Sequence, residues 1–201
     1  MTHHTLDMPI TEAQARSLRV GDTVTLETTL FGIRDATLIA MFDRGRPTRL
    51  DLKGHAVVHT APNVRKLDEP GNAPQYEPVC IGTTTSMRME RFTHDLMQRE
   101  GVRLIIGKGG MGPATLDAFR EFGGAYLAVV GGAAALQTTW IEAIEDVDFE
   151  DLNPECLWKF RIKGFGPLLV TMDSHGGSLH AEINDQAAAR RAAVLASIGG
   201  E

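Results

Sequence analysis

Hydrophobic and polar residues recur along the chain in patterns that predict strands followed by helices. Strict alternation or short apolar runs predict strands at residues 23–28, 55–60, 79–81, 102–106 and 125–130. Helices are predicted after these strands at residues 87–100 and 114–122, and a glycine turn at residues 131–136 leads into the start of another helix. Two consecutive strand–turn–helix units predict a parallel strand pair with a right-handed crossover. We therefore expect an α/β fold, a mixed sheet with parallel strand–helix units flanked by helices.

The other segments predict shorter or more exposed elements. A short helix capped by Thr11 is expected, and the apolar segment after residues 31–36 predicts a helix through Phe42. Residues rich in Pro, Gly and Asn predict an exposed loop at 64–78, and acidic residues predict a solvated segment at 140–151. Further strands are expected at residues 156–162, 168–173 and 178–183, and the last two of these could form a hairpin. A terminal helix is expected from Asp185.

Composition is that of a soluble globular protein. With 43% hydrophobic and 23% charged residues, the 201-residue chain predicts one domain spanning residues 1–201. The net charge of −6 gives no reason to expect nucleic acid or an anionic membrane as the main partner. Because the start of the chain lacks a signal-peptide pattern and no apolar run approaches the roughly 20 residues of a membrane span, we expect a cytoplasmic location.

Cysteine and histidine are too few and too scattered to predict a metal site. Cys80 and Cys156 are the only cysteines, too few for a four-cysteine zinc site or for the three thiolates of an iron–sulfur cluster. Reduced structural thiols are the simpler interpretation. His55 and His59 share one face of their predicted strand, and we interpret them as a structural pair.

The glycine turn, residues 107–113 (Gly-Lys-Gly-Gly-Met-Gly-Pro), lies between a predicted strand and a predicted helix. Its glycines let the backbone approach a ligand, the free amides of the helix start favour an anion, and Lys108 adds a positive charge. Gly107, Gly109 and Gly112 match the dinucleotide fingerprint, but the next strand ends without the acidic residue that would hold a ribose. A small anion explains more than a nucleotide, which stays open as an alternative.

Two further cations are expected beside Lys108. Arg34 lies at a predicted strand-to-helix junction, where an ordinary surface ion pair with Asp35 is the alternative. Arg88 lies in the first turn of a predicted helix, where the helix dipole disfavours a cation unless an anion is also present. The hydroxyls of residues 83–86 exceed the one that a helix cap needs. Placed at the carboxyl ends of strands, these groups predict a clamp for a small dicarboxylate.

Five stretches together resemble the β subunit of class I iron–sulfur hydro-lyases, the L(+)-tartrate dehydratases and class I fumarases, over nearly the whole chain. They are residues 82–89 (Gly-Thr-Thr-Thr-Ser-Met-Arg-Met), 107–112, 34–36 (Arg-Asp-Ala), and 165–168 with 173–176. The resemblance implies a swivelling β/β/α domain and a reversible loss or addition of water on a dicarboxylate, either L(+)-tartrate or fumarate and L-malate. It further implies an αβ hetero-oligomer in which three cysteines of the α subunit carry a [4Fe–4S] cluster.

The same resemblance implies roles for individual residues. Thr84 matches the family's proposed catalytic base, and Thr85 is grouped with it as a substrate-binding residue. Arg88 and Lys108 match ligands of the substrate carboxylates, and Arg34 matches the arginine of the family's Arg-Asp motif. No metal ligand is assigned to this chain.

Two positions depart from the family pattern. Thr83 stands where the family usually has proline, and Leu38 stands where the Arg-Asp motif usually continues to histidine. A rival function from another class is a non-catalytic module that binds an anion or a nucleotide and regulates a partner. Calorimetric titrations with dicarboxylates and with nucleotides would separate the two hypotheses.

Overall fold

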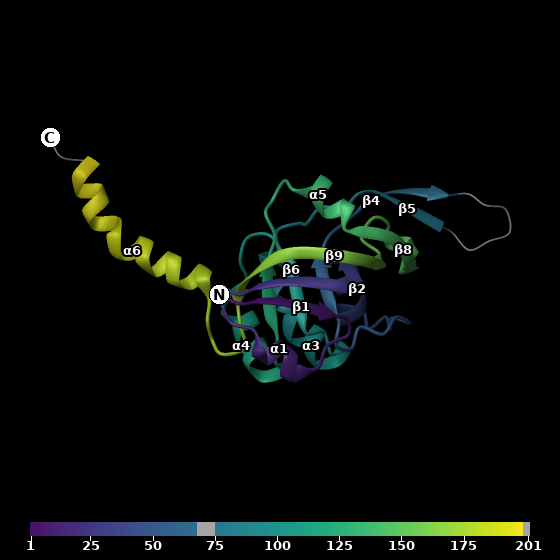
Figure 1. The fold of residues 1–201 in the computed structure, drawn as a ribbon, viewed down its shortest axis with the longest axis horizontal. Helices are drawn as coiled ribbons and strands as arrows, with labels where there is room; N and C mark the ends of the chain where they lie inside the picture. Colours follow the sequence, from purple (N-terminus) through teal and green to yellow (C-terminus); the bar gives the residue numbers. More distant parts are fainter. Residues whose placement is uncertain (68–74, 199–201) are drawn as a thin grey trace.

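A mixed sheet organises the computed structural model, which describes residues 1–67 and 75–198 (Figure 1). Its seven strands lie in the order β1-β2-β3-β6-β7-β9-β8. Their bounds are β1 His3–Asp7, β2 Thr23–Ile33, β3 Ala56–His59, β6 Leu104–Gly107, β7 Ala125–Ala128, β8 Ile141–Asp148 and β9 Leu157–Met172. The pairs β2–β3, β3–β6 and β6–β7 are parallel, whereas β9 pairs antiparallel with its neighbours. The predicted parallel pair of strand–helix units is confirmed.

The sheet closes on itself because β2 pairs not only with β3 but also with β9. The β2–β9 register runs from Thr23 opposite Leu169 to Gly32 opposite Trp158, so β2, β3, β6, β7 and β9 form a ring. The expected separate strands at 156–162 and 168–173 are wrong, since β9 is continuous over 16 residues. Gly166 permits this continuity, because a Cβ there would lie 2.6 Å from the Val24 carbonyl oxygen.

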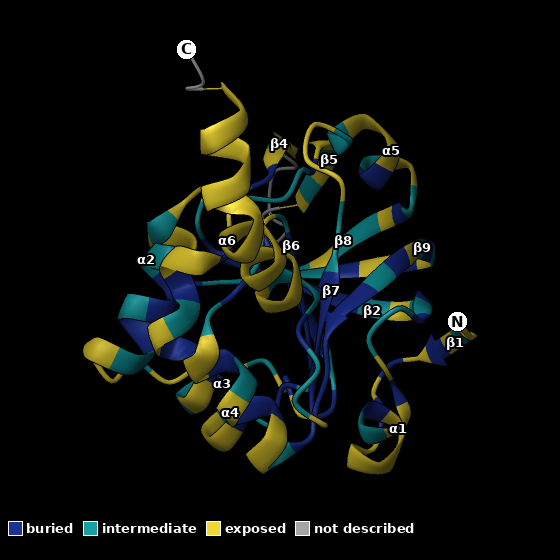
Figure 2. Cartoon of the chain, turned by 90° about the vertical axis from the view of Figure 1, so that its left-hand side faces the viewer, coloured by how far each residue is buried: buried dark blue, intermediate teal, exposed yellow. Residues whose placement is uncertain are grey.

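Alternating side chains of the ring strands build two hydrophobic cores in the described part of the chain. Val58, Ile106 and Leu127 join Trp158 and other β9 side chains in the core enclosed by the ring. Their sequence neighbours Val57, Ile105 and Tyr126 belong to the second core, where the helices cover the sheet. Both faces are therefore buried (Figure 2), which explains why these strands are apolar runs without a polar face.

Short helical segments cover the second core and the ends of the ring. They are α1 Glu12–Ser17, α2 Asp35–Leu38, the π-helical η1 Ile39–Asp43, the 3-10 helix η2 Met87–Phe92, α3 Thr93–Glu100, α4 Pro113–Phe122, α5 Ala134–Thr139 and the 3-10 turn η3 Glu150–Leu152. The prediction of a helix capped by Thr11 is confirmed, since its hydroxyl accepts from the Gln14 amide in a capping box. The helix expected after residues 31–36 and through Phe42 is confirmed: α2 begins at Asp35, and the π-helical η1 continues it to Asp43.

Two other predictions of local structure are wrong, and a third is incomplete. Residues 64–78 do not form one loop, because β4 Asn63–Leu67 and β5 Gln75–Cys80 pair as an antiparallel hairpin; residues 68–74 lie outside the described residues. The acidic segment 140–151 contains β8, which pairs along β9; apart from Ile141, Val147 and Phe149, its residues are exposed or partly exposed, as predicted. The strand expected at 178–183 is instead the start of α6, Leu179–Ile198.

Helix α6 leaves the body of the protein and extends away from it (Figure 1). None of its residues is buried, and Ile183, Val194, Leu195 and Ile198 expose more than half of their surface. Within the described ranges, no helix is long and apolar enough to cross a membrane. Its first turn contacts the body, where His180 lies close to Gly110, but residues 181–198 are all exposed and therefore contribute little to the stability of the fold.

Truncation after Asn184 is therefore expected to change the free energy of unfolding by less than about 0.5 kcal/mol, as for surface changes without buried partners. Urea denaturation of the full and truncated chains measures this. Phe119→Ala, which empties a fully buried site on α4, serves as the sensitive control and should cost about 3 to 5 kcal/mol. If truncation lowered the free energy of unfolding by more than about 1.5 kcal/mol, residues 185–198 of α6 would have to pack on the body in solution.

Candidate functional site

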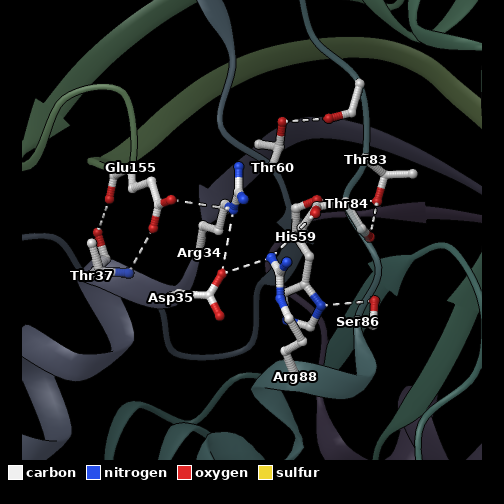
Figure 3. Close-up of polar contacts among 12 residues, drawn as sticks. Arg34, Asp35, Thr37, His59, Thr60, Thr83, Thr84, Ser86, Arg88 and Glu155 are labelled. Atoms are coloured by element: carbon white, nitrogen blue, oxygen red, sulfur yellow. Dashed lines mark hydrogen bonds and ion pairs between the residues drawn. The ribbon is translucent and has the colours of Figure 1, made fainter.

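The candidate site lies at the carboxyl ends of the parallel strands. Arg34 follows β2, Thr60 follows β3 and Lys108 follows β6, so parallel pairing brings all three to one edge of the sheet. The hydroxyl-rich segment 83–86 crosses the same edge between β5 and η2 (Figure 3). The groups that the sequence placed at separate strand ends therefore share one edge of the sheet.

Backbone hydrogen bonds fix the threonine segment between the ends of β3 and β6. The Thr84 amide donates to the His59 carbonyl oxygen at 2.8 Å, and the Thr83 hydroxyl donates to the same oxygen at 3.1 Å. Thr85 forms a parallel bridge with Lys108, whose carbonyl oxygen accepts from the Ser86 amide at 3.2 Å. The structure thus brings Thr84 and Thr85 together with Lys108.

Asp35 joins the two arginines of the site. Its Oδ2 lies 3.3 Å from Arg34 Nε and accepts from Arg88 Nη2 at 2.9 Å (Figure 3). The same Arg88 nitrogen lies 3.5 Å from the Thr84 hydroxyl oxygen. One carboxylate therefore already bridges the cations that the sequence assigned to a substrate carboxylate.

Glu155, from the loop between β8 and β9, holds the start of α2 and Arg34. One of its carboxylate oxygens accepts from the Ala36 amide at 2.8 Å, and the other lies 3.4 Å from Arg34 Nε. The Thr37 hydroxyl donates to the Glu155 carbonyl oxygen. The sequence analysis missed Glu155, because 119 residues separate it from Ala36 and no local pattern connects them.

The start of α4 does not offer a free anion site, contrary to the expectation from the glycine turn. Glu90 of η2 occupies it, since its Oε1 accepts from the Thr115 amide at 3.2 Å. A Cβ at Gly112 would lie 2.4 Å from Glu90 Oε2, so only glycine leaves room for this carboxylate. The anion that the helix dipole favours is therefore a side chain of the protein itself.

Lys108 remains the contribution of the glycine turn to the site. Its side chain passes the glycines that precede α5, since a Cβ at Gly131 would lie 3.4 Å from Lys108 Cδ. Over residues 1–67 and 75–198, no carboxylate lies within ion-pair distance of its ammonium group. The turn thus provides a cation next to Thr85 rather than a phosphate cradle.

Behind the threonine segment lies a chain of buried polar side chains that the sequence analysis did not predict. The Tyr126 hydroxyl donates to Ser86 Oγ at 2.8 Å, and Ser86 Oγ lies 2.9 Å from His59 Nδ1. All three side chains are at most 1% exposed. Ser86 precedes η2 but does not cap it, because its hydroxyl turns toward His59. The only sequence signal that pointed to such a role for Ser86 was that residues 83–86 carry more hydroxyls than one helix cap needs.

Burial determines the protonation of this chain. It lowers the pKa of His59 to about 4, against the opposing effect of the Asp35 carboxylate, so the imidazole is neutral at pH 7. Burial also raises the pKa of Tyr126 to about 12, against the opposing effect of its hydrogen bond to Ser86. Both groups are therefore neutral hydrogen-bonding partners. The interpretation of His55 and His59 as structural rather than metal-ligating stays a prediction.

The two cysteines are free thiols that differ in burial. Cys80 is exposed and free, whereas Cys156 is buried and free, and burial raises the pKa of its thiol to about 11. The described residues contain no group of three or more His, Cys, Asp or Glu side chains that could hold a metal ion. Two cysteines, one of them a buried neutral thiol, do not fit an iron–sulfur cluster.

Comparison with known proteins places this chain in a known family. The fumarase C-terminus family matches residues 1–183. The chain is 40% identical over 194 residues to the L(+)-tartrate dehydratase subunit beta of Escherichia coli strain K12, covering 96% of this chain and 94% of that one. It is 33% identical to a putative L(+)-tartrate dehydratase subunit beta of Methanocaldococcus jannaschii, covering 87% and 90%.

A longer relative matches as well. The chain is 44% identical over 180 residues to a putative fumarate hydratase class I of Geobacillus stearothermophilus. That match covers 89% of this chain but only 34% of the relative. The same kind of domain therefore also occurs as one part of a larger polypeptide.

Neutral His59 is expected to make the protein less stable in acid. An unfolded histidine takes up a proton near pH 6.5, whereas folded His59 does so only near pH 4, so the unfolded state binds more protons between these values. Stability present above pH 6.5 is then lost as the pH falls toward 4, by about 3 kcal/mol from this group. Denaturant unfolding from pH 7.5 to 4.5 measures the loss.

His59→Asn is the matched control, because asparagine keeps a polar atom at the Nδ1 position but does not titrate. The difference in unfolding free energy between the two proteins should narrow steadily below pH 6.5. Parallel curves for the two proteins would contradict a buried neutral His59.

Proposed function

The chain belongs to the β-subunit family of class I hydro-lyases, and from this membership we propose that its clustered cations bind the carboxylates of a small dicarboxylate. The chain is a hydro-lyase β subunit. The proposed reaction is reversible water elimination, either from L(+)-tartrate to oxaloacetate or between L-malate and fumarate. One observation carries the assignment of the site: the Asp35 carboxylate between Arg34 Nε and Arg88 Nη2 marks a position where these arginines accept a carboxylate.

The proposed roles follow from charge and position. Arg34, Arg88 and Lys108 bind the substrate carboxylates and stabilise the negative charge that develops next to the carbon losing a proton. Thr85, which bridges to Lys108, completes the binding side. Charge-assisted hydrogen bonds of this kind also orient the substrate, because guanidinium groups bind carboxylates in a fixed geometry.

Thr84 is the proposed base that takes the carbon-bound proton. An alcohol is a poor base unless its surroundings stabilise the alkoxide. Arg88 Nη2, 3.5 Å from the Thr84 oxygen, supplies a cation that favours the charged form of this group. Thr84 and Arg88 are thus proposed to act as a unit.

A partner subunit is proposed to carry the [4Fe–4S] cluster, since the two cysteines of this chain do not fit one. The subunit names of two relatives and the partial coverage of the longer one support an α partner and an αβ hetero-oligomer. We propose that residues 1–201 act as one catalytic domain, a swivelling β/β/α domain, in the cytoplasm. The exposed part of α6, residues 181–198, offers a surface for such an assembly.

Leu38 bears on the choice of substrate. It is 1% exposed and packs in the second core, so position 38 contributes no polar group to the site. We propose that substrate contacts come from Arg34, Arg88, Lys108 and the threonines, without a contribution from position 38.

Activity is expected only from the complex. The isolated chain should convert neither L(+)-tartrate nor fumarate, whereas the chain co-expressed with its α subunit and purified without oxygen should convert at least one of them. Spectrophotometric assays of both reactions measure this. Full activity of the isolated chain would refute the need for a partner, and an inactive complex on both substrates would refute the proposed substrate class.

Lys108→Ala in the complex should raise KM and lower kcat, because the cation contacts the substrate in both the ground and transition states. The loss of one charge-assisted contact costs about 1.5 to 3 kcal/mol, so kcat/KM should fall roughly 10- to 150-fold. Lys163→Ala, which removes an exposed lysine of β9, is the matched control and should leave the kinetics unchanged. Unchanged kinetics in Lys108→Ala would remove Lys108 from the site.

A further inference from the structure

The buried chain Tyr126–Ser86–His59 connects three separate elements directly behind the candidate base. Tyr126 belongs to β7, His59 ends β3, and Ser86 follows Thr84 by two residues. The contact is tight, because a Cβ at Gly107 would lie 1.8 Å from Ser86 Oγ. Only glycine at the end of β6 lets this hydroxyl reach both of its partners.

The two hydroxyl protons of this chain determine the direction of its hydrogen bonds, because each needs an acceptor. Ser86 Oγ has Tyr126 and His59 as its side-chain partners among the described residues. If Tyr126 donates to Ser86 and Ser86 donates to His59 Nδ1, both hydroxyl protons have acceptors. The reverse direction would leave the Tyr126 proton without an acceptor, which is costly for a buried group. Nδ1 is therefore the acceptor, and the ring proton resides on Nε2.

His59 holds the threonine segment twice. Its carbonyl oxygen accepts from the Thr84 amide and the Thr83 hydroxyl, and its ring accepts from Ser86. The segment that carries Thr84 is thus held to His59 both by the backbone carbonyl and by the ring of that residue. Movement of the segment away from β3 would break both contacts at once.

We propose that His59 is a positioning residue of the hydro-lyase site, which fixes Thr84 through a relay in which Tyr126 donates to Ser86 and Ser86 donates to His59 Nδ1. The proposal rests on the proposed function, because it assigns Thr84 as the group being positioned. Asp35 is the charged group that acts on the titration of the ring, and its carboxylate is itself paired with Arg88. The relay itself stays uncharged.

The first test needs no activity. In the full chain with ¹⁵N-labelled histidine at pH 7, His59 should show an unprotonated Nδ1 and a protonated Nε2. Amide hydrogen exchange should show Thr84 protected, and Ser86→Ala should lower that protection at least about tenfold, as expected when a bond that restrains the segment is lost. A protonated Nδ1, or unchanged exchange at Thr84, would overturn the relay.

The second test uses the αβ complex and separates the two ring nitrogens. Asparagine places an amide where His59 has Nδ1, whereas glutamine places one where it has Nε2. His59→Asn should keep kcat within about threefold, while His59→Gln and Ser86→Ala should lower kcat about tenfold with little change in KM. Tyr76→Phe, which removes the other tyrosine hydroxyl from a bond to Glu150, should change nothing.

A merely structural role predicts a different pattern, in which the variants lower the yield of folded complex but keep its kcat. Equal kcat in Asn and Gln variants, or a normal kcat in Ser86→Ala, would overturn the proposal. A complex that converts neither dicarboxylate would refute the proposed function instead, and the nitrogen and exchange measurements would still decide whether the relay exists.

Discussion

The antiparallel pairing of β2 with β9 is the interaction on which the rest of the molecule depends. It closes the sheet into a ring, encloses one core and leaves the outer face of the parallel strands for the helices. Because the parallel strands are held side by side in this way, their carboxyl ends meet at one edge. Ligand sites of α/β sheets collect at such edges, where loops and helix starts converge.

The two arginines of that edge are paired with acids of the protein itself. Asp35 bridges Arg34 and Arg88, and Glu155 binds the start of α2 while also pairing with Arg34. A substrate carboxylate would enter a site whose arginines are already oriented by acids. Such preorganisation lowers the entropic cost of binding, and it lets the cations respond to charge that develops only during the reaction.

A second, uncharged set of contacts supports the same edge from behind. Burial keeps His59 and Tyr126 neutral, so the relay through Ser86 restrains the threonine segment without adding charge beside the cations. Glu90 has a similar effect at α4, because it occupies the helix start and confines the glycine turn to positioning Lys108. Charged groups thus face the site, and neutral or paired groups hold them.

The sequence by itself determined the parallel strand–helix units, the capped helix at Thr11 and the placement of Arg34, Arg88 and Lys108 near strand ends, because periodicity, caps and turn residues are local signals. Its family resemblance is borne out by the matching family and relatives. Only the tertiary structure decided that residues 157–172 form one strand, that Glu90 occupies the helix start, and that His59, Ser86 and Tyr126 are bonded. These contacts join residues far apart in the chain, and no local pattern encodes which distant strands or side chains become neighbours.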